Sequence, residues 1–154
     1  MSRLLALCAG ICFLSMRPAL MTAQEATYDE SALRVDQHGG TVSIVRGVSE
    51  TVVLKVGAFR AVDVAGIVSP SANAVTQAKI FEHDYRPGTW LVSLGIATFG
   101  VAVGSHQIAD LNQVIPAGLT IAAVSLTTYG GWRLGNAYRA LSKSVWWYNR
   151  DLKK

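Results

Sequence analysis

The sequence predicts an α+β membrane protein, built from a small antiparallel β-rich domain with one short helix, a two-helix transmembrane hairpin and a C-terminal amphipathic helix. Three observations lead to this prediction: two long stretches without charge, short β-branched runs separated by glycines, and a terminal segment with an apolar stripe. Of the 154 residues, 51% are hydrophobic and 16% are charged. The hydrophobic fraction is high for a soluble chain of this size, so part of the chain is expected to lie in a membrane.

Residues 1–23 have the three parts of a secretory signal peptide. Arg3 forms a short positive region, an apolar run follows from residue 4 to residue 15, and small residues lead to Ala23. We therefore expect export, with residues 24–88 on the periplasmic side of a bacterial envelope membrane. Met21 fits the small-x-small rule for cleavage after Ala23 poorly, so an uncleaved N-terminal anchor is the alternative.

Residues 24–88 are expected to form the small exported domain. Thr41–Arg46 and Thr51–Val56 are β-branched runs on either side of Gly47, which predicts an antiparallel pair of strands. Phe59–Val64 is the candidate for a third strand.

A helix of about three turns is predicted after these strands. It begins at Ser71, which can cap it, and ends before Pro87, because the residue before a proline disfavours the helical conformation. Three strands and one helix bury little surface, so this domain is expected to be marginally stable alone.

Residues 89–133 are predicted to form the transmembrane hairpin. Thr89–Ser105 and Val114–Trp132 carry no charge and are about 17 and 19 residues long, close to the length that spans a bilayer. The short link between them requires an antiparallel arrangement. Trp90 and Trp132 flank the hairpin, where interfacial aromatic residues belong.

Glycines recur at four-residue spacing in both predicted spans. Gly100 pairs with Gly104, and Gly131 pairs with Gly135. This spacing lets helix backbones approach closely in lipid, so we predict that these four residues pack helices together. The alternative is that they reflect only the general frequency of glycine in membrane helices.

Residues 134–154 are predicted to form an amphipathic tail helix, in which apolar residues recur every three or four positions and the cations lie off this stripe. We predict a bend at Gly130, Gly131 or Gly135, after which the tail lies on the membrane interface or a partner. The alternative is that the stripe packs on the 24–88 domain or on a second subunit. Besides Trp90 and Trp132, the residues assigned to membrane or partner contact are Arg139, Lys143, Trp146, Trp147, Tyr148 and Arg150.

The tail also carries the pattern Ala-Leu-x-x-Ser-Val-x-x-Tyr-Asn, formed by Ala140, Leu141, Ser144, Val145, Tyr148 and Asn149. Together with the signal peptide, the β-rich segment and the glycine-rich hairpin, it resembles a group of uncharacterised bacterial envelope proteins over roughly residues 66–152. Ser144 stands where that group usually has alanine. The resemblance implies an envelope location and this order of elements, and it implies no activity.

The titratable residues offer little for catalysis or metal binding. Glu82, His83 and Asp84 form the densest cluster, but consecutive residues on a helix point in different directions and make poor metal ligands. Both cysteines, Cys8 and Cys12, lie in the signal segment, so a processed chain has no thiol. We therefore predict no catalytic residue, no metal and no cofactor.

The charge pattern argues against nucleic-acid binding, because the basic residues gather at one end of the hairpin. Residues 133–154 hold six Lys or Arg against one acid, whereas residues 24–88 are net negative. Export of the N-terminal domain places this basic tail outside, against the usual excess of Lys and Arg on the cytoplasmic side. We give the signal peptide precedence and assign the charge of the tail to lipid or partner binding.

The expected function is a non-catalytic structural or accessory subunit of a bacterial envelope membrane assembly, in contact with the lipid bilayer and with other membrane-protein subunits. The first alternative is a membrane-tethered binding module, in which the 24–88 domain takes a ligand or peptide by strand addition. The second alternative is a proton- or ion-handling membrane protein that uses Glu82, His83 or Asp110.

Overall fold

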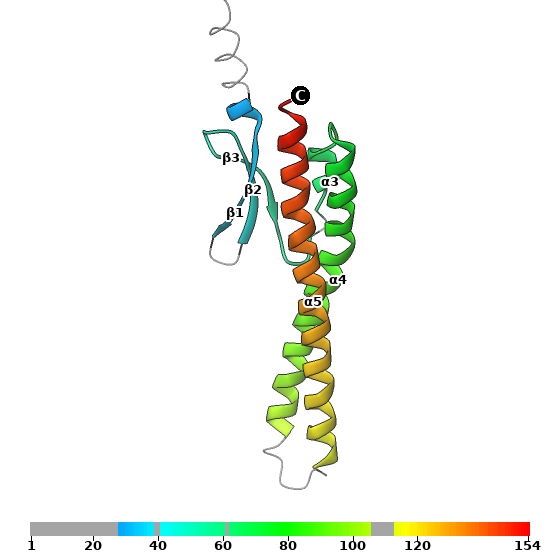
Figure 1. The fold of residues 1–154 in the computed structure, drawn as a ribbon. Coiled ribbons are helices and arrows are strands. Elements are labelled where there is room, and N and C mark those ends of the chain that lie inside the picture. The colour runs from blue at the N-terminus through cyan, green and yellow to red at the C-terminus, as the bar shows by residue number, and fades with distance from the viewer. Residues whose placement is uncertain (1–27, 39–40, 61, 106–112) are drawn as a thin grey trace, which may run out of the picture.

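The computed structural model describes residues 28–38, 41–60, 62–105 and 113–154. A small antiparallel sheet is followed by two long helices that pack together and extend well beyond the sheet as a hairpin (Figure 1). The C-terminus lies at the sheet end (Figure 1). The predicted signal peptide lies outside the described residues, as does most of the link between the two helices. The predicted α+β class, with a small sheet before two long helices, is confirmed.

The sheet has three strands in the order β1-β2-β3: β1 (Leu33–His38), β2 (Thr41–Arg46) and β3 (Thr51–Val56). Both neighbouring pairs are antiparallel. The predicted pairing of β2 with β3 is therefore confirmed. Gly47 begins the connection between them with φ +71°, and a Cβ there would lie 2.7 Å from the Glu30 carbonyl oxygen, so the turn requires glycine.

The prediction of a third strand at Phe59–Val64 is wrong, because the third strand is β1, which precedes the predicted pair. In β1 only Leu33 is buried and the other residues are exposed, so it lacks the apolar alternation of a half-buried strand. Residues after β3 instead lead into the short helix α3 (Val64–Ile67). The Asp63 carboxylate accepts a hydrogen bond from the Gly66 backbone N–H at 2.7 Å and caps this helix, which favours helix over strand here.

Helix α4 (Ala72–Ser105) begins where the sequence predicts and continues past the predicted end. The Ser71 hydroxyl accepts a hydrogen bond from the Ala74 backbone N–H at 3.3 Å and caps the first turn. The prediction that the helix ends before Pro87 is wrong, because Pro87 lies inside α4. A proline in a helix costs about 3 kcal/mol. Tyr85 and Gly88, on either side of it, are buried, so packing offsets this cost.

Helix α5 (Val114–Asp151) runs without interruption for 38 residues. The predicted bend at Gly130, Gly131 or Gly135 is therefore wrong, and the tail continues the second helix of the hairpin. The apolar stripe of the tail packs on the N-terminal domain, which is the alternative that the sequence left open. Leu141 is 1% exposed, and Val145 and Tyr148 are each 7% exposed.

One core joins the sheet, α3, the first half of α4 and the last half of α5. Its largest fully buried members include Phe81, Leu33, Ile44 and Leu141, which come from α4, β1, β2 and α5 in turn. The thin predicted domain is thus covered by the tail helix. Because residues from 28–88 and from 134–154 share this core, neither part is expected to fold alone.

Candidate functional site: an apolar hairpin below a charged head

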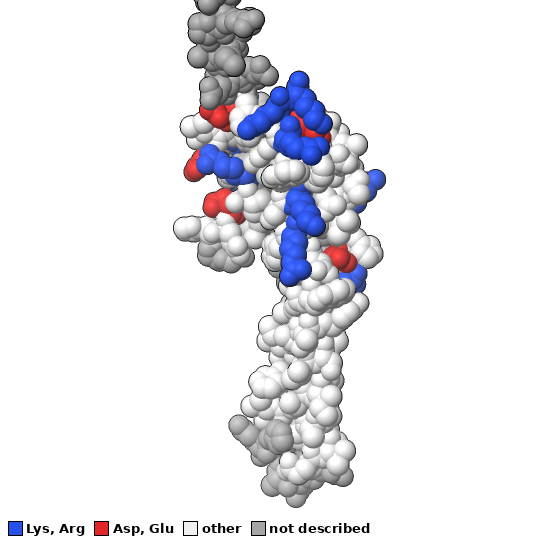
Figure 2. Space-filling model, viewed as in Figure 1, with Lys and Arg blue, Asp and Glu red and all other residues white. Residues whose placement is uncertain are grey.

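The far half of the hairpin is uncharged and exposed. No Asp, Glu, Lys or Arg occurs from Pro87 to Ser105 or from Val114 to Trp132, and the described residues in the lower part of the space-filling view show neither sign of charge (Figure 2). Both helices are long and apolar enough to cross a membrane by length and composition, and only 17% of each tested window is buried. Two such helices weakly suggest membrane association.

The length of the uncharged part fits a bilayer. About 19 residues in each helix span about 28 Å at 1.5 Å per residue, and the hydrocarbon core of a bilayer is about 30 Å thick. The exposed side chains along this length are large and apolar. They include Leu94, Ile96, Phe99, Val101, Val103, Ile121 and Val124.

Most serine and threonine hydroxyl groups in this part donate a hydrogen bond within their own helix. Thr98 donates to the Leu94 carbonyl oxygen at 2.8 Å, and Ser125 donates to the Ile121 carbonyl oxygen at 2.9 Å. Thr127 does the same to Ala123 at 2.8 Å. In a medium without water a polar side chain needs an internal partner, so these serines and threonines are compatible with lipid.

Aromatic residues mark the border between the charged and uncharged parts. Gly88 of α4 lies against Leu134 of α5, and this antiparallel register places Trp90 and Trp132 at the same level of the hairpin. Both tryptophans are more than half exposed, at 55% and 61%. Trp132 stacks on Tyr129, with ring centroids 5.9 Å apart. Exposed tryptophans at the end of an apolar segment are typical of a membrane interface.

An ion pair joins the two helices just above this border. The Arg133 side chain donates to Asp84 Oδ1 through two nitrogens, at 2.7 and 3.2 Å. His83 Nδ1 lies 3.0 Å from the same oxygen. Desolvation acts to raise the pKa of Asp84, but the hydrogen bonds and charges of Arg133 and His83 outweigh it and hold this pKa below its ordinary value.

Small residues spaced seven apart form the seam between the helices. They are Gly88, Gly95 and Ala102 on α4, and Ala123, Gly130 and Ala137 on α5. A Cβ on Gly130 would lie 2.8 Å from the Val92 backbone nitrogen, and one on Gly95 would lie 2.9 Å from that of Thr127, so only glycine fits at either position. A seven-residue repeat produces a left-handed supercoil, and α4 passes from one side of α5 to the other along the hairpin (Figure 1).

The four glycines that the sequence assigns to helix packing do not lie in this seam. A Cβ added to Gly100, Gly104, Gly131 or Gly135 would meet nothing within 4 Å. The prediction from four-residue spacing missed the seam because its small residues recur every seven positions, in both helices. Any packing role of these four glycines is toward something outside this chain, and it stays a prediction.

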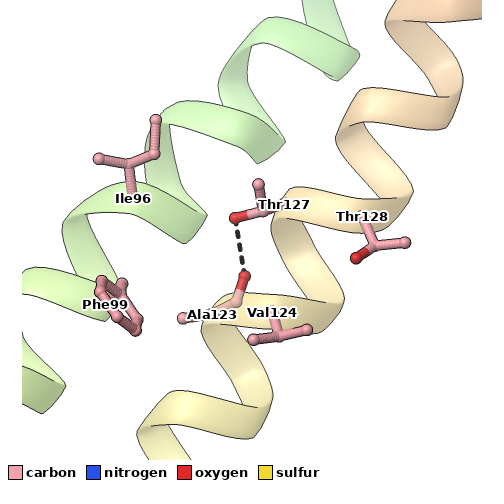
Figure 3. A pocket seen from close by; sticks show the side chains of 6 residues that line it. All are labelled: Ile96, Phe99, Ala123, Val124, Thr127 and Thr128. Atoms are coloured by element: carbon pink, nitrogen blue, oxygen red, sulfur yellow. Dashed lines mark hydrogen bonds between the residues drawn. The ribbon is translucent and has the colours of Figure 1, made fainter.

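A shallow apolar groove of about 310 Å³ lies between the helices near the middle of the uncharged length. Ile96 and Phe99 line it from α4, and Ala123, Val124, Thr127 and Thr128 line it from α5 (Figure 3). Thr127 uses its hydroxyl on the Ala123 carbonyl oxygen, so little polar capacity faces the groove (Figure 3). Its lining suits an acyl chain or an apolar side chain better than a polar ligand.

The six residues of the tail pattern each contact the head. Ala140, Leu141, Val145 and Tyr148 lie in the core. Ser144 is fully buried, and its hydroxyl donates to the Ala74 carbonyl oxygen at 2.9 Å, which joins α5 to α4. Asn149 hydrogen-bonds the backbone of Leu33 in β1. The pattern is therefore explained by packing, and it positions the tail against the sheet.

Residues assigned to membrane or partner contact in the tail separate into two groups. Tyr148 is a core residue, so its assignment to an external contact is wrong. Trp146 is 56% exposed and Trp147 is half-buried. Along the continuous helix, Trp146 lies about 21 Å beyond Trp132 at 1.5 Å per residue. If the hairpin lies in a bilayer, this distance takes Trp146 out of reach of the headgroups, so contact with a partner is the assignment that stays a prediction.

The side chains of Glu82, His83 and Asp84 point to different surroundings and do not form one site. Glu82 Oε1 accepts a hydrogen bond from the Ala65 backbone N–H at 2.8 Å and so supports α3. Asp84 pairs with Arg133, and the His83 side chain is 77% exposed. Within the described ranges, no three His, Cys, Asp or Glu residues come together as they would around a metal ion.

Comparisons with protein-family models, with curated proteins and with solved structures found nothing that matches this chain. The resemblance to bacterial envelope proteins therefore stays a prediction. The class of protein that the fold defines is a small α+β head on a two-helix apolar stalk.

Proposed function

We propose that this chain is a membrane-anchored, non-catalytic accessory subunit of a bacterial envelope membrane assembly. The observation that carries the proposal is the uncharged, exposed length of the hairpin, about 28 Å long, below a head that holds every Lys and Arg of the described residues. In water such a surface leads to aggregation, whereas in lipid it is stable without further cover.

Two features support a role within an assembly rather than as an isolated anchor. The glycines Gly100, Gly104, Gly131 and Gly135 leave open backbone on the outside of the hairpin, where other transmembrane helices can approach closely. The head is small, and polar groups such as those of Glu82 and Asn149 hold its own elements together.

The proposal is tested by fractionation followed by purification in mild detergent. The full chain is expected in the membrane fraction after alkaline carbonate washing, and it should copurify with a constant set of membrane proteins. Replacing Gly100 and Gly104 together by Leu should remove that set without lowering the melting temperature of the chain itself. Ala122→Leu, at an exposed small residue on the side of α5 away from Gly131 and Gly135, is the control. A chain that is released by carbonate, or that purifies alone, would contradict the proposal.

A binding module is the second candidate, and it is favoured by the outer edge of β3. This strand pairs only with β2 among the described strands, and Val52 on it is 48% exposed. Saturable binding of an extended peptide to the full chain, with shifts of the β3 amide signals, would favour this function. The isolated 24–88 segment is unsuitable for the test because its core includes α5.

A further inference from the structure

The outward face of the last part of α5 carries a regular row of cations and one tryptophan. The residues of this face, which we call the basic stripe, are Arg139, Lys143, Trp146, Arg150 and Lys153, at successive spacings of four and three. All five are exposed. Lys153 follows the last residue of α5, and its Nζ lies 4.6 Å from the centroid of the Tyr28 ring. Each of the other four lies two positions after a buried residue of α5, such as Ala137 or Leu141, and two positions correspond to about 200° around a helix. The stripe therefore points directly away from the core, and Figure 2 shows basic side chains along this face.

The cations of the stripe have little to neutralise them within the chain. Across the described ranges, Arg139 and Lys143 form no ion pair. Arg150 lies 3.7 Å from Asp151, but that carboxylate is closer to Lys154, at 2.9 Å. The stripe thus keeps an unbalanced positive charge along about 21 Å of helix at 1.5 Å per residue.

An ordered aromatic group stands in the middle of the stripe. The Arg150 guanidinium carbon lies 3.8 Å from the centroid of the Trp147 ring and 5.3 Å from that of Trp146. The two rings meet edge to face, with centroids 5.0 Å apart. These cation–π and ring contacts fix the side chains before any partner binds. Exposed tryptophan and arginine are the residues most enriched at the centres of protein interfaces.

A lipid surface does not account for the whole stripe. Because α5 is continuous, Arg139 lies about 10 Å and Lys153 about 31 Å beyond Trp132 along the helix. Electrostatic attraction in physiological salt is screened over about 8 Å. Headgroups at the level of Trp90 and Trp132 therefore attract only the lowest cation, and the three upper positions need a partner that stands alongside the head.

We propose that the basic stripe docks an acidic α-helix of a partner protein on the same side of the membrane as the sheet. The alternating spacing of four and three is that of a coiled-coil seam, so a partner helix with carboxylates at the same spacing can face each cation in turn. An apolar residue of that helix can then cover Trp146. That the partner belongs to the same assembly rests on the proposed function. The charge and spacing of the stripe are observed independently of that function.

The test uses the full chain in nanodiscs of phosphatidylcholine and two synthetic helical peptides of identical composition. In one peptide the glutamates follow the spacing of the stripe, and in the other they are distributed around the helix. The first should bind at least about tenfold more tightly than the second. Lys143→Glu combined with Arg150→Glu should weaken that binding by about tenfold or more. Lys79→Glu, at an exposed cation of α4 with no ion pair among the described residues, is the matched control and should change nothing.

Lipid binding is measured in the same system. In a variant with Trp90, Trp132 and Trp147 replaced by Phe, the fluorescence of Trp146 should be unaffected by brominated phosphatidylglycerol in the nanodisc. Equal binding of both peptides, or quenching of Trp146 by the brominated lipid, would overturn the proposal. A chain that stays in solution without lipid would contradict the membrane assignment alone. Its binding to both peptides can still be measured, so the docking proposal is tested independently.

Discussion

The side-chain amide of Asn149 forms two hydrogen bonds with the backbone of Leu33, 116 residues earlier in the chain. The Leu33 N–H donates to Asn149 Oδ1 at 2.8 Å, and Asn149 Nδ2 donates to the Leu33 carbonyl oxygen at 2.7 Å. The amide thus pairs with the first residue of β1 much as a neighbouring strand would. It connects the last turns of α5 to the sheet and fixes the direction of the tail.

Asn149→Ala should lower the free energy of unfolding by about 1–3 kcal/mol, because it leaves a partly buried donor and acceptor of Leu33 without partners. Denaturant unfolding of the full chain in detergent measures the change. Asn136→Ala, on the same helix, is the control and is expected to have a much smaller effect. Equal losses in the two variants would show that the Asn149 contact contributes nothing specific.

Glycines in the seam and outside it should respond in opposite ways to the same change. Gly95→Ala and Gly130→Ala should each destabilise the hairpin by about 1–3 kcal/mol, because the added methyl group forces two backbones apart. Gly100→Ala should be neutral or slightly stabilising, since a Cβ there meets nothing within 4 Å. Thermal unfolding in detergent gives the comparison. Greater loss at Gly100 than at Gly95 would mean that the helices pack through the other face.

The Asp84–Arg133 ion pair should make the stability of the hairpin dependent on acid pH. The pKa of Asp84 is lowered in the folded chain, so the stabilisation is fully present above the ordinary value of 3.8 and is lost as pH falls through the lowered pKa. Asp84→Asn should remove this part of the pH dependence and lower stability at neutral pH by about 1 kcal/mol. Melting temperatures of both proteins between pH 7 and about pH 2 test the sign. An unchanged acid profile in Asp84→Asn would be inconsistent with the pair.

Tyr148 and Trp146 lie two residues apart and should differ sharply on truncation. Tyr148→Ala should destabilise the fold by about 3 kcal/mol, because it empties a core position. Trp146→Ala should leave the melting temperature nearly unchanged, since this side chain is 56% exposed. If both substitutions are equally harmful, the inner and outer faces of the tail have been assigned incorrectly.

Local sequence patterns predict the elements well where packing and propensity agree. The β2–β3 pair, the cap at Ser71 and the two uncharged helices were all visible as alternation, capping or composition. Strand β1 was missed because it is an edge strand with one buried residue, so its polar sequence gives no alternation.

Where the predictions failed, tertiary packing overrides a local signal. Pro87 is tolerated because Tyr85 and Gly88, close to it in the helix, are buried, and Gly130 belongs to the seam between the helices rather than to a bend. The seven-residue spacing of small residues could have been found in the sequence, since it occurs in both helices. Its meaning depends on the register between them, which no single segment specifies. The same holds for Asn149, whose partner is far away in the chain.

The most direct test of the account is the depth of the hairpin in a bilayer, measured with single nitroxide spin labels in reconstituted full-length protein. Labels are placed at Ile121, Val124 and Thr128 in the uncharged part and at Arg139 and Lys143 in the head, all of which are exposed. Relaxation by oxygen reports lipid, and relaxation by a water-soluble nickel complex reports water. We predict that oxygen dominates at the first three positions, with a maximum near Val124, and that nickel dominates at Arg139 and Lys143. Nickel access at Val124 equal to that at Lys143 would contradict the claim that the hairpin spans the membrane.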